Sequence, residues 1–244
     1  MNFLQETYLL IFSQWYFTMG FFFFFFAAMY LVGAFLTEFF IKKLSAKGKL
    51  VEINHALKPN QKRDEILRSL TSVFVFSLQA IPLQWLISKG FFEIGLNNFA
   101  DILWQIPVLF VWNEIHFYII HRLLHQKWLF KNVHFVHHLS KEPTAFSVFS
   151  FHWIEAFLLG TVIFFPLIFF KLNIFAALSL PVFSIVLNFI GHSNHDRYWI
   201  GHEDEIKHFS FRHSMHHKWS RGNFGFMLPF LDQIFNTSLP KNKN

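Results

Sequence analysis

Long, nearly continuous apolar segments constrain this chain more than any other feature. Residues 8–41, 67–88, 102–120, 151–171 and 173–190 contain few charged side chains. Each approaches or exceeds the ~20 residues that a helix needs to cross a bilayer. Because backbone polar groups in lipid must be paired within their own segment, we expect these segments to be helices. The sequence therefore predicts an all-α fold of polytopic membrane helical hairpins.

The composition agrees with a membrane protein. Of the 244 residues, 53% are hydrophobic and only 15% are charged, whereas charged residues make up about a quarter of a soluble domain. The first apolar segment is longer than one span requires, so it is tilted, broken near Gly20, or protrudes from the bilayer. These alternatives leave the side of the N-terminus open.

Basic residues predict the orientation of the chain. The connector over residues 42–68 is rich in Lys and Arg, and positive charge next to spans marks the cytoplasmic side. Two hairpins return the chain to this side, at His121 and at His192. We expect one membrane-embedded domain, residues 1–244, with a helical histidine-rich cytoplasmic cap formed by residues 121–150 and 191–239. Nucleic acid is not an expected partner, because the basic residues are spread along membrane-side loops.

Three histidine clusters lie beyond the predicted spans. Their patterns are one H-x-x-x-H and two H-x-x-H-H, and on a helix each cluster would share one face. Neutral imidazole suits iron, copper, nickel and zinc, and the absence of Cys excludes thiolate sites on this chain. Eight imidazoles are too many for one ion and fit two. The candidate ligands and catalytic residues are His121, His125, His134, His137, His138, His213, His216 and His217.

Other polar residues near the clusters are also candidates. His192 emerges where the second hairpin returns, so we expect it to be a ninth ligand, with His195 competing for that role. Asp196 is four residues from His192 and would reach its imidazole on a helical turn. His202 and His208 are expected to be solvated. Glu114 and His116, at the end of the third predicted span, are candidates for lining a functional cavity.

The histidine clusters and their surroundings match a family pattern. Residues 121–125 are similar to an H-R-x-x-H motif, and residues 151–155 resemble an H-P-x-E element in which Trp153 replaces Pro. Residues 191–196 resemble a single-histidine element after the second hairpin. Residues 223–237 resemble a closing N-Y-G and D-R-L-F-G-T pattern, in which Phe224, Gln233 and Asn236 are replacements. As a whole, the chain resembles the membrane-bound fatty acid hydroxylase and sterol desaturase superfamily.

This resemblance implies an oxidoreductase. Such enzymes hold two iron ions, for which zinc substitutes during expression, and use dioxygen as co-substrate to attack an unactivated C–H bond of a bilayer lipid. The lipid would be sterol-like or fatty acyl, the product a hydroxylated or a desaturated lipid, and the electrons would come from a separate donor protein. Supporting contacts behind the ligands are expected from Glu155, Asp196, Asp232, His195 and His152.

Two other classes of protein fit part of the pattern. A histidine-rich membrane metal transporter would place its site near the bilayer midplane, whereas the clusters here follow the spans. A zinc-dependent membrane hydrolase would need an open position and a carboxylate base, which eight imidazoles match poorly. The compact chain favours a bacterial inner membrane, and the endoplasmic reticulum remains an alternative.

Overall fold

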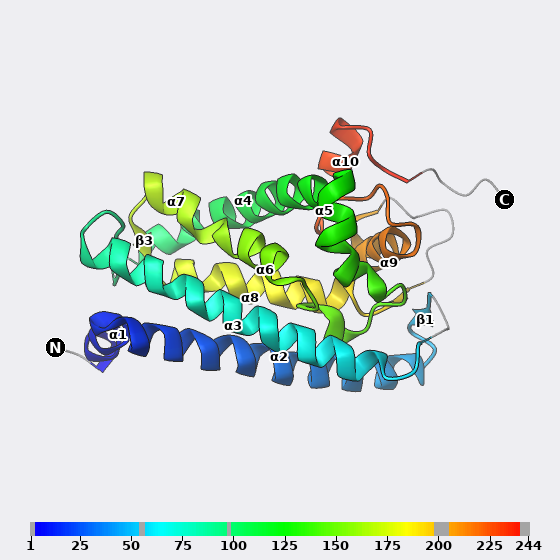
Figure 1. Ribbon diagram of the computed structural model, residues 1–244, viewed down its shortest axis with the longest axis horizontal. Coiled ribbons are helices and arrows are strands. Elements are labelled where there is room, and N and C mark those ends of the chain that lie inside the picture. Colours follow the sequence, from blue (N-terminus) through cyan, green and yellow to red (C-terminus); the bar gives the residue numbers. More distant parts are fainter. Residues whose placement is uncertain (1–2, 54–56, 97–98, 198–204, 240–244) are drawn as a thin grey trace.

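The computed structural model describes residues 3–53, 57–96, 99–197 and 205–239 (Figure 1). Within these ranges the regular structure is almost entirely helical, and the strands are only two residues long. The all-α prediction is confirmed.

The first apolar segment forms two helices, α1 (Phe3–Ser13) and α2 (Trp15–Ser45). Gln14 between them is extended, with φ −142° and ψ 144°. The break therefore lies at Gln14, whereas Gly20 is accommodated inside α2. The α2 helix is apolar around its whole circumference and exposes large side chains such as Phe24, which is typical of a lipid-facing span.

Three of the described helices are long and apolar enough to cross a membrane: α2, α3 (Gln61–Ser88) and α8 (Ile174–Gly191). They run roughly parallel to one another along the long axis of the molecule (Figure 1). The α4 helix (Ala100–Leu124) covers the third predicted span but is not among these three. It buries several polar side chains, Asn113 and Glu114 among them.

The predicted span over residues 151–171 is instead three short pieces, α6 (Trp153–Gly160), η3 (Thr161–Ile163) and α7 (Phe164–Phe169). Side chains from neighbouring helices donate hydrogen bonds to backbone carbonyls in this segment. Gln79 donates to the carbonyl of Phe157, and Trp112 donates to that of Val162, each at 2.8 Å. The three pieces follow one another without a gap from Trp153 to Phe169, and the 3-10 turn η3, whose Val162 accepts one of these two hydrogen bonds, lies between α6 and α7.

Two short strand pairs join the hairpins at opposite ends of the bundle. At one end β2 (Ile94–Gly95) pairs in parallel with β3 (Leu172–Asn173). At the other end β1 (Val51–Glu52) pairs antiparallel with β4 (His195–Asp196). The basic connector after α2 is therefore hydrogen-bonded to the segment that follows α8.

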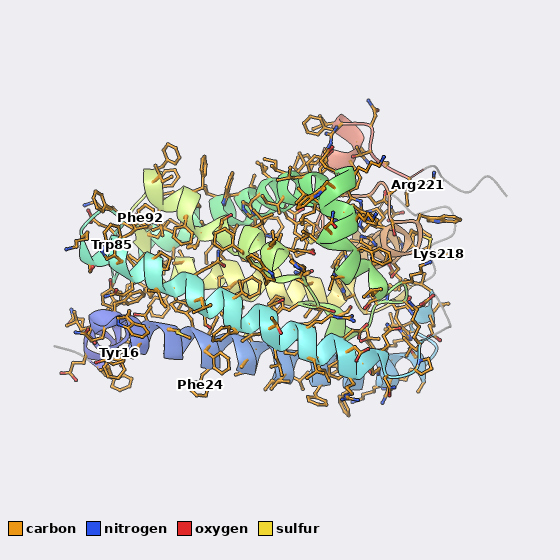
Figure 2. All side chains as sticks on the ribbon, in the orientation of Figure 1. Tyr16, Phe24, Trp85, Phe92, Lys218 and Arg221 are labelled. Carbon is orange, nitrogen blue, oxygen red and sulfur yellow. The ribbon has the colours of Figure 1, made fainter. Side chains whose placement is uncertain are left out.

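The polar cap covers the end of the bundle at which β1 and β4 pair (Figure 1). Basic Lys218 and Arg221 lie at this end, while the exposed aromatic residues Tyr16 and Trp85 lie at the other (Figure 2). Aromatic side chains of this kind favour the bilayer interface. The described cap elements are α5 (Lys127–Asn132), η1 (His134–Leu139), η2 (Ala145–Ser147), η4 (Ile206–His208), α9 (Phe209–Trp219) and α10 (Phe230–Ile234).

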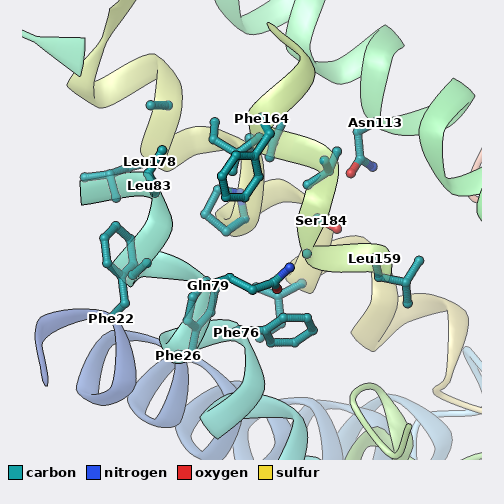
Figure 3. Close-up of a pocket in the computed structure, with 18 of the residues that line it drawn as sticks. Phe22, Phe26, Phe76, Gln79, Leu83, Asn113, Leu159, Phe164, Leu178 and Ser184 are labelled. Atoms are coloured by element: carbon teal, nitrogen blue, oxygen red, sulfur yellow. The ribbon is translucent and has the colours of Figure 1, made fainter. Parts of the chain in front are cut away.

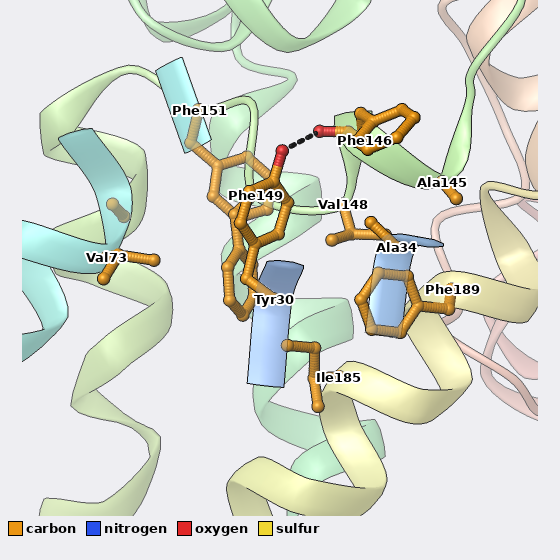
Figure 4. Close-up of a cluster of buried hydrophobic side chains, with 11 residues drawn as sticks. Tyr30, Ala34, Val73, Ala145, Phe146, Val148, Phe149, Phe151, Ile185 and Phe189 are labelled. Atoms are coloured by element: carbon orange, nitrogen blue, oxygen red, sulfur yellow. Dashed lines mark hydrogen bonds between the residues drawn. The ribbon is translucent and has the colours of Figure 1, made fainter. Parts of the chain in front are cut away.

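A buried apolar cluster attaches the cap to the bundle. Tyr30 of α2 packs with Phe149, and its hydroxyl donates to the carbonyl of Phe146 at 2.9 Å (Figure 4). Val73 of α3 and Phe189 of α8 complete the contact from the other two apolar helices. The loop that follows the second histidine cluster is thus held against all three candidate spans.

Candidate metal centre

Four segments of the chain bring the histidine clusters together. The last turn of α4 carries His121, and His125 caps that helix. The second cluster lies in η1, a 3-10 helix, and the third lies in α9. His192 directly follows the end of α8 at Gly191. The nine predicted ligands therefore come from four separate segments and meet in one volume.

Nine imidazoles form two nitrogen groups. In each group every residue offers one nitrogen, and these nitrogens all lie within 4.8 Å of one another. All of the side chains are buried except His125, which is half-buried. We call them the first nitrogen group, His121, His125, His134, His138 and His216, and the second nitrogen group, His137, His192, His213 and His217.

Each of the two H-x-x-H-H clusters contributes nitrogens to both groups. In η1 the outer pair His134 and His138 belongs to the first nitrogen group and His137 to the second. In α9 the order is reversed, because His213 and His217 belong to the second group and His216 to the first. Residues four apart stay together, and the histidine between them turns to the other group.

Backbone acceptors define the tautomers of several imidazoles. A carbonyl oxygen can only accept, so Nδ1 of His121 donates to the Phe224 carbonyl at 2.9 Å and Nδ1 of His216 donates to the Gly222 carbonyl at 2.6 Å. The Ser147 hydroxyl donates to the carbonyl of Thr144, so it accepts from Nδ1 of His192 at 2.7 Å. Each of these three imidazoles keeps an unprotonated Nε2.

Within each group, several Nε2 atoms lie so close together that their lone pairs would repel one another in neutral imidazoles. In the first nitrogen group, Nε2 of His138 lies 3.1 Å from Nε2 of His216 and 3.2 Å from that of His134. A proton on His138 could serve one of these contacts and not both. In the second group, Nε2 of His213 lies 2.8 Å from His192 and 3.1 Å from His217. A cation removes this repulsion, since ligands ~2.1 Å from a metal and at right angles lie ~3.0 Å apart.

Burial keeps the imidazoles in the form that binds metal. Desolvation lowers the pKa of His216 to about 4. Desolvation, reinforced by the neighbouring His216, lowers the pKa of His125 to about 2. Desolvation also lowers the pKa of His137 and His217 well below the usual value. The imidazoles are therefore neutral at pH 7, and neutral imidazole is the metal-binding species.

Glu155 is placed directly behind one predicted ligand. Its Oε1 accepts from Nδ1 of His134 at 2.8 Å, and both side chains are almost fully buried. This bond orients the ring and directs its Nε2 into the first nitrogen group. Glu155 lies in the first turn of α6. His152 caps this helix, because its side chain accepts a hydrogen bond from the amide of Ile154.

The predicted contact between Asp196 and His192 is not formed. Helix α8 ends at Gly191, so the four-residue spacing does not lie on a helical turn. Asp196 instead accepts from Nδ1 of His208 at 3.1 Å and from the amide of Phe211 at 3.0 Å. His208 is thus buried and bonded, contrary to the expectation that it is solvated, and it belongs to neither nitrogen group.

The remaining predicted residues lie outside the two groups. Asp232 accepts from the amides of Phe224 and Gly225, so it holds the loop whose carbonyl binds His121. His195 is in β4, and its Nδ1 contacts the carbonyl of Ser193. His152 is the cap of α6, as described above. His202 lies outside the described residues.

Some functional contacts had no sequence signal. The carbonyls of Phe224 and Gly222 orient two predicted ligands, but a backbone acceptor leaves no trace in residue type. Nothing in the sequence distinguishes Ser147 from other serines, and only its position beside His192 in the structure reveals its role.

Asn236, which replaces a glycine of the family pattern, has φ +52°, a conformation that Asn tolerates better than most residues.

Comparison with known proteins decides the family. The sequence profile of the fatty acid hydroxylase family matches residues 106–237, which include all nine histidines. This chain belongs to the fatty acid hydroxylase family.

Several curated relatives of this fatty acid hydroxylase family member are named for sterol chemistry. A Delta(7)-sterol 5(6)-desaturase of Candida albicans is 28% identical over 86% of this chain and 53% of its own length. A putative methylsterol monooxygenase of Dictyostelium discoideum is 26% identical over 69% and 64%. Human lathosterol oxidase is 30% identical over 52% and 46%. The chain spans about half the length of the curated relatives it matches, and no solved structure matches it significantly.

An apolar cavity of about 150 Å³ lies next to a small hollow that is lined by histidines of both nitrogen groups. The cavity lies between α2, α3, α4, α6 and α8 (Figure 3). Phe117, Phe151, Leu159 and Asn188 line both this cavity and the small hollow that contains His121, His137 and His192. The inner end of the cavity is therefore separated from the histidines only by these shared side chains.

The two ionisable residues late in α4 have different surroundings. His116 lies in the cavity wall, and its Nε2 contacts the hydroxyl of Thr161 at 3.1 Å. Glu114 instead accepts from the backbone amides of Met227 and Leu228 in the cap. His116 therefore faces the cavity, whereas Glu114 fixes the cap to α4.

Proposed function

We propose that this protein is a membrane di-iron oxygenase that hydroxylates or desaturates an unactivated C–H bond of a lipid. The observation that carries the proposal is the position of the apolar cavity beside the two nitrogen groups, with whose hollow it shares lining residues. A hydrocarbon has no group on which acid–base chemistry can act, so its oxidation needs a redox metal beside the bound chain. Iron in the two groups, when bound, would supply the activation of dioxygen.

The protein's own residues bind the lipid, orient the imidazoles and exclude water. The cavity wall binds the lipid by apolar contact and keeps water from the reacting carbon. Glu155, Ser147 and the carbonyls of Phe224 and Gly222 orient the imidazoles. These contacts keep Nε2 of His121, His192 and His216 unprotonated for metal.

The overall reaction requires dioxygen, two electrons and two protons. In hydroxylation one oxygen atom enters the C–H bond and the other leaves as water. In desaturation the lipid loses two hydrogen atoms and both oxygen atoms leave as water. The nine histidines are compatible with either outcome. The names of the relatives favour a sterol-like lipid over a fatty acyl chain as substrate.

A separate donor protein would deliver the electrons to the cap. The Lys and Arg excess next to the spans favours a cytoplasmic position for the cap. The relatives reported above are eukaryotic, which lends weight to the endoplasmic reticulum over the bacterial inner membrane.

The two alternative classes are less well supported. A transporter needs a path lined by polar groups, whereas the wall of the cavity is mainly Phe, Leu, Ile and Ala. A zinc hydrolase needs a carboxylate base beside the metal. The described nitrogen groups contain imidazoles alone, and Glu155 accepts from His134.

Turnover with labelled dioxygen tests the proposal. Purified protein reconstituted with iron should convert a sterol, in the presence of a chemical reductant, to a product that gains one oxygen atom or loses two hydrogen atoms. Label from dioxygen should appear in the lipid when the product is an alcohol. The variant His195→Ala, outside both groups, is the matched control and should keep this activity. Product formation without dioxygen, or equal product with zinc alone, would refute the proposal.

A further inference from the structure

One predicted ligand is partly open to its surroundings. His125 is half-buried, whereas the other eight imidazoles of the two nitrogen groups are buried. Two segments border its ring. The ring centroid of Phe130, in α5, lies 5.1 Å from that of His125, and the centroid of Phe224, in the loop after α9, lies 4.9 Å from it. The first nitrogen group is therefore most accessible between α5 and this loop.

The two bordering segments carry only positive charge. Residues 125–132 and 218–225 contain four Lys or Arg side chains and neither Asp nor Glu. All four cations are exposed, and none of them forms an ion pair with a carboxylate of the described chain. Glu155 and Asp232 instead face His134 and the backbone amides of residues 224 and 225. This part of the cap thus has a positive charge that no described carboxylate neutralises by contact.

Two exposed Trp side chains accompany the cations. Trp128 is 67% exposed and Trp219 is 54% exposed. The Lys218 ammonium and the Arg221 guanidinium each lie 6.0 Å from the centroid of the Trp219 ring. Trp and Arg are enriched in protein–protein interfaces, where they carry much of the binding energy. We call the following six residues the basic surface: Lys127, Trp128, Lys131, Lys218, Trp219 and Arg221.

The loop that carries half of the basic surface also touches the first nitrogen group. Ser220 lies between Trp219 and Arg221 in the chain, and its hydroxyl is 3.2 Å from Nδ1 of His138. The carbonyl of Gly222, the next residue after Arg221, accepts from Nδ1 of His216. The residues that contact two imidazoles of the first nitrogen group are therefore interleaved with exposed residues of the basic surface.

We propose that the basic surface is the docking site of a protein partner that has an acidic surface and carries electrons to the first nitrogen group. Attraction between opposite charges would orient the partner within the ~8 Å over which charges act at physiological ionic strength. Each docking would oxidise one donor by one electron, so two reduced donors supply the two electrons of the overall reaction. The role of electron donor rests on the proposed function, whereas the acidity of the partner rests on the charges of the surface alone.

Anionic lipid headgroups are the other partner that Lys, Arg and Trp side chains could contact. The surroundings of the basic surface favour a protein. It borders the one partly open imidazole, and its loop holds two further imidazoles. Attachment to a lipid headgroup would require neither feature, whereas delivery of electrons requires a short path from the docked partner to the histidines.

Binding of an acidic electron carrier tests the docking site without turnover. The probes are a plant-type [2Fe–2S] ferredoxin, which has an acidic surface, and the same ferredoxin after amidation of its carboxylates. Purified protein in phosphatidylcholine nanodiscs should bind the unmodified ferredoxin on the order of tenfold more tightly than the amidated one. Raising the salt concentration from about 50 mM to about 500 mM should remove most of this difference, because salt screens exposed charges.

Charge reversal locates the contact. Lys131→Glu combined with Arg221→Glu should weaken the binding of unmodified ferredoxin roughly tenfold, because each change replaces an attraction with a repulsion. The matched control is Lys47→Glu combined with Lys49→Glu in the basic connector. These exposed lysines lie at the same end of the molecule, and their reversal changes the net charge by the same amount. The control should bind ferredoxin within about twofold of the wild-type protein.

Two further measurements keep the result decisive. The unfolding midpoint and the metal content of each variant show whether it is folded. Should the double variant in the basic surface fail to fold, Lys127→Glu alone decides. A fluorophore attached to Arg221→Cys compares the two partners, because ferredoxin in neutral nanodiscs should shield it from an aqueous quencher. If phosphatidylserine nanodiscs shield the fluorophore and ferredoxin does not, the surface contacts the membrane and the proposal is overturned.

The outcomes separate this inference from the proposed function. If the wild-type protein binds both ferredoxins equally, or if the folded double variant binds as tightly as the connector control, the docking site is refuted. Selective weakening in the double variant supports the docking site even when no lipid is oxidised. Lipid oxidation with a chemical reductant, together with unchanged ferredoxin binding in the double variant, supports the oxygenase and removes the docking site.

Discussion

His137 and His138 are adjacent in the chain, yet their nitrogens belong to different groups. The same holds for His216 and His217 in α9. Consecutive residues point ~100° apart on an α-helix and ~120° apart on a 3-10 helix, so a pair of adjacent histidines can supply two metals that lie side by side. The ring centroids of His138 and His217 are 4.9 Å apart, which shows how closely the two groups adjoin.

The residue scale provides a test of the contact behind His134. Glu155→Gln keeps an oxygen that can accept from His134 but replaces the carboxyl group with an amide. Loss of such a supporting carboxylate should lower metal affinity by about 10–100-fold. Metal content after dialysis against a graded series of chelator concentrations measures this change. Glu93→Gln, an exposed carboxylate that pairs with Lys171 far from the histidines, should match the wild-type protein; an equal loss in both variants would contradict the assignment.

His192 and His195 offer a second comparison at this scale. His192 is buried with its Nε2 2.8 Å from that of His213, whereas Nδ1 of His195 contacts the carbonyl of Ser193. We expect His192→Ala to lose about one of two bound metal ions and His195→Ala to lose none. Elemental analysis of purified protein gives the stoichiometry. Full metal occupancy in His192→Ala would remove this histidine from the ligand set.

At the scale of elements, glycine lets α2 approach α8 closely. A Cβ at Gly33 would overlap the buried ring of Phe189, whereas a Cβ at Gly20 would meet nothing within 4 Å. Both glycines lie inside α2, so their helix propensities are comparable. The contact at Gly33 therefore belongs to the packing of the apolar bundle rather than to the helix itself.

This difference predicts opposite effects of the same substitution. Gly33→Ala should destabilise the protein by about 1–3 kcal/mol, the usual cost of overpacking. Gly20→Ala should be neutral or stabilise by up to ~1 kcal/mol through helix propensity. Thermal unfolding in one detergent compares the two variants with the wild-type protein. Equal midpoints for both variants would show that α2 and α8 do not pack as described.

At the scale of the whole molecule, the connector and the cap lie at one end. Besides the pairing of β1 with β4, the ammonium of Lys58 donates to the carbonyl of Leu139 at 3.0 Å. The chain has no Cys, so single cysteines can be placed at Lys47 and Lys141 and labelled in intact membranes. Both should react from the same side, which the basic connector predicts to be cytoplasmic. Reaction from opposite sides would overturn the shared end.

The sequence predicted the helical class, the histidine-rich cap and the residues that meet in the centre. Periodicity and apolar length are local properties, and they determine helices and faces. They do not report tertiary hydrogen bonds. The carbonyl of Phe157 accepts from Gln79, a contact between α6 and α3 that the local pattern of residues 151–171 does not indicate. Asp196 binds His208 because α8 has already ended. The division of each H-x-x-H-H cluster between two groups likewise depends on how η1 and α9 meet.

The division of histidines between the groups also determines the order in which the two groups are completed during synthesis. When synthesis has passed Leu139, four of the five residues of the first nitrogen group exist, but only His137 of the second. The second group gains its other three members from residues 192–217. A nascent chain therefore has most of the first nitrogen group long before it has the second, and both groups are complete only once α9 has left the ribosome. Arrested chains of graded length, assayed for retained metal, would reveal two separate steps of loading.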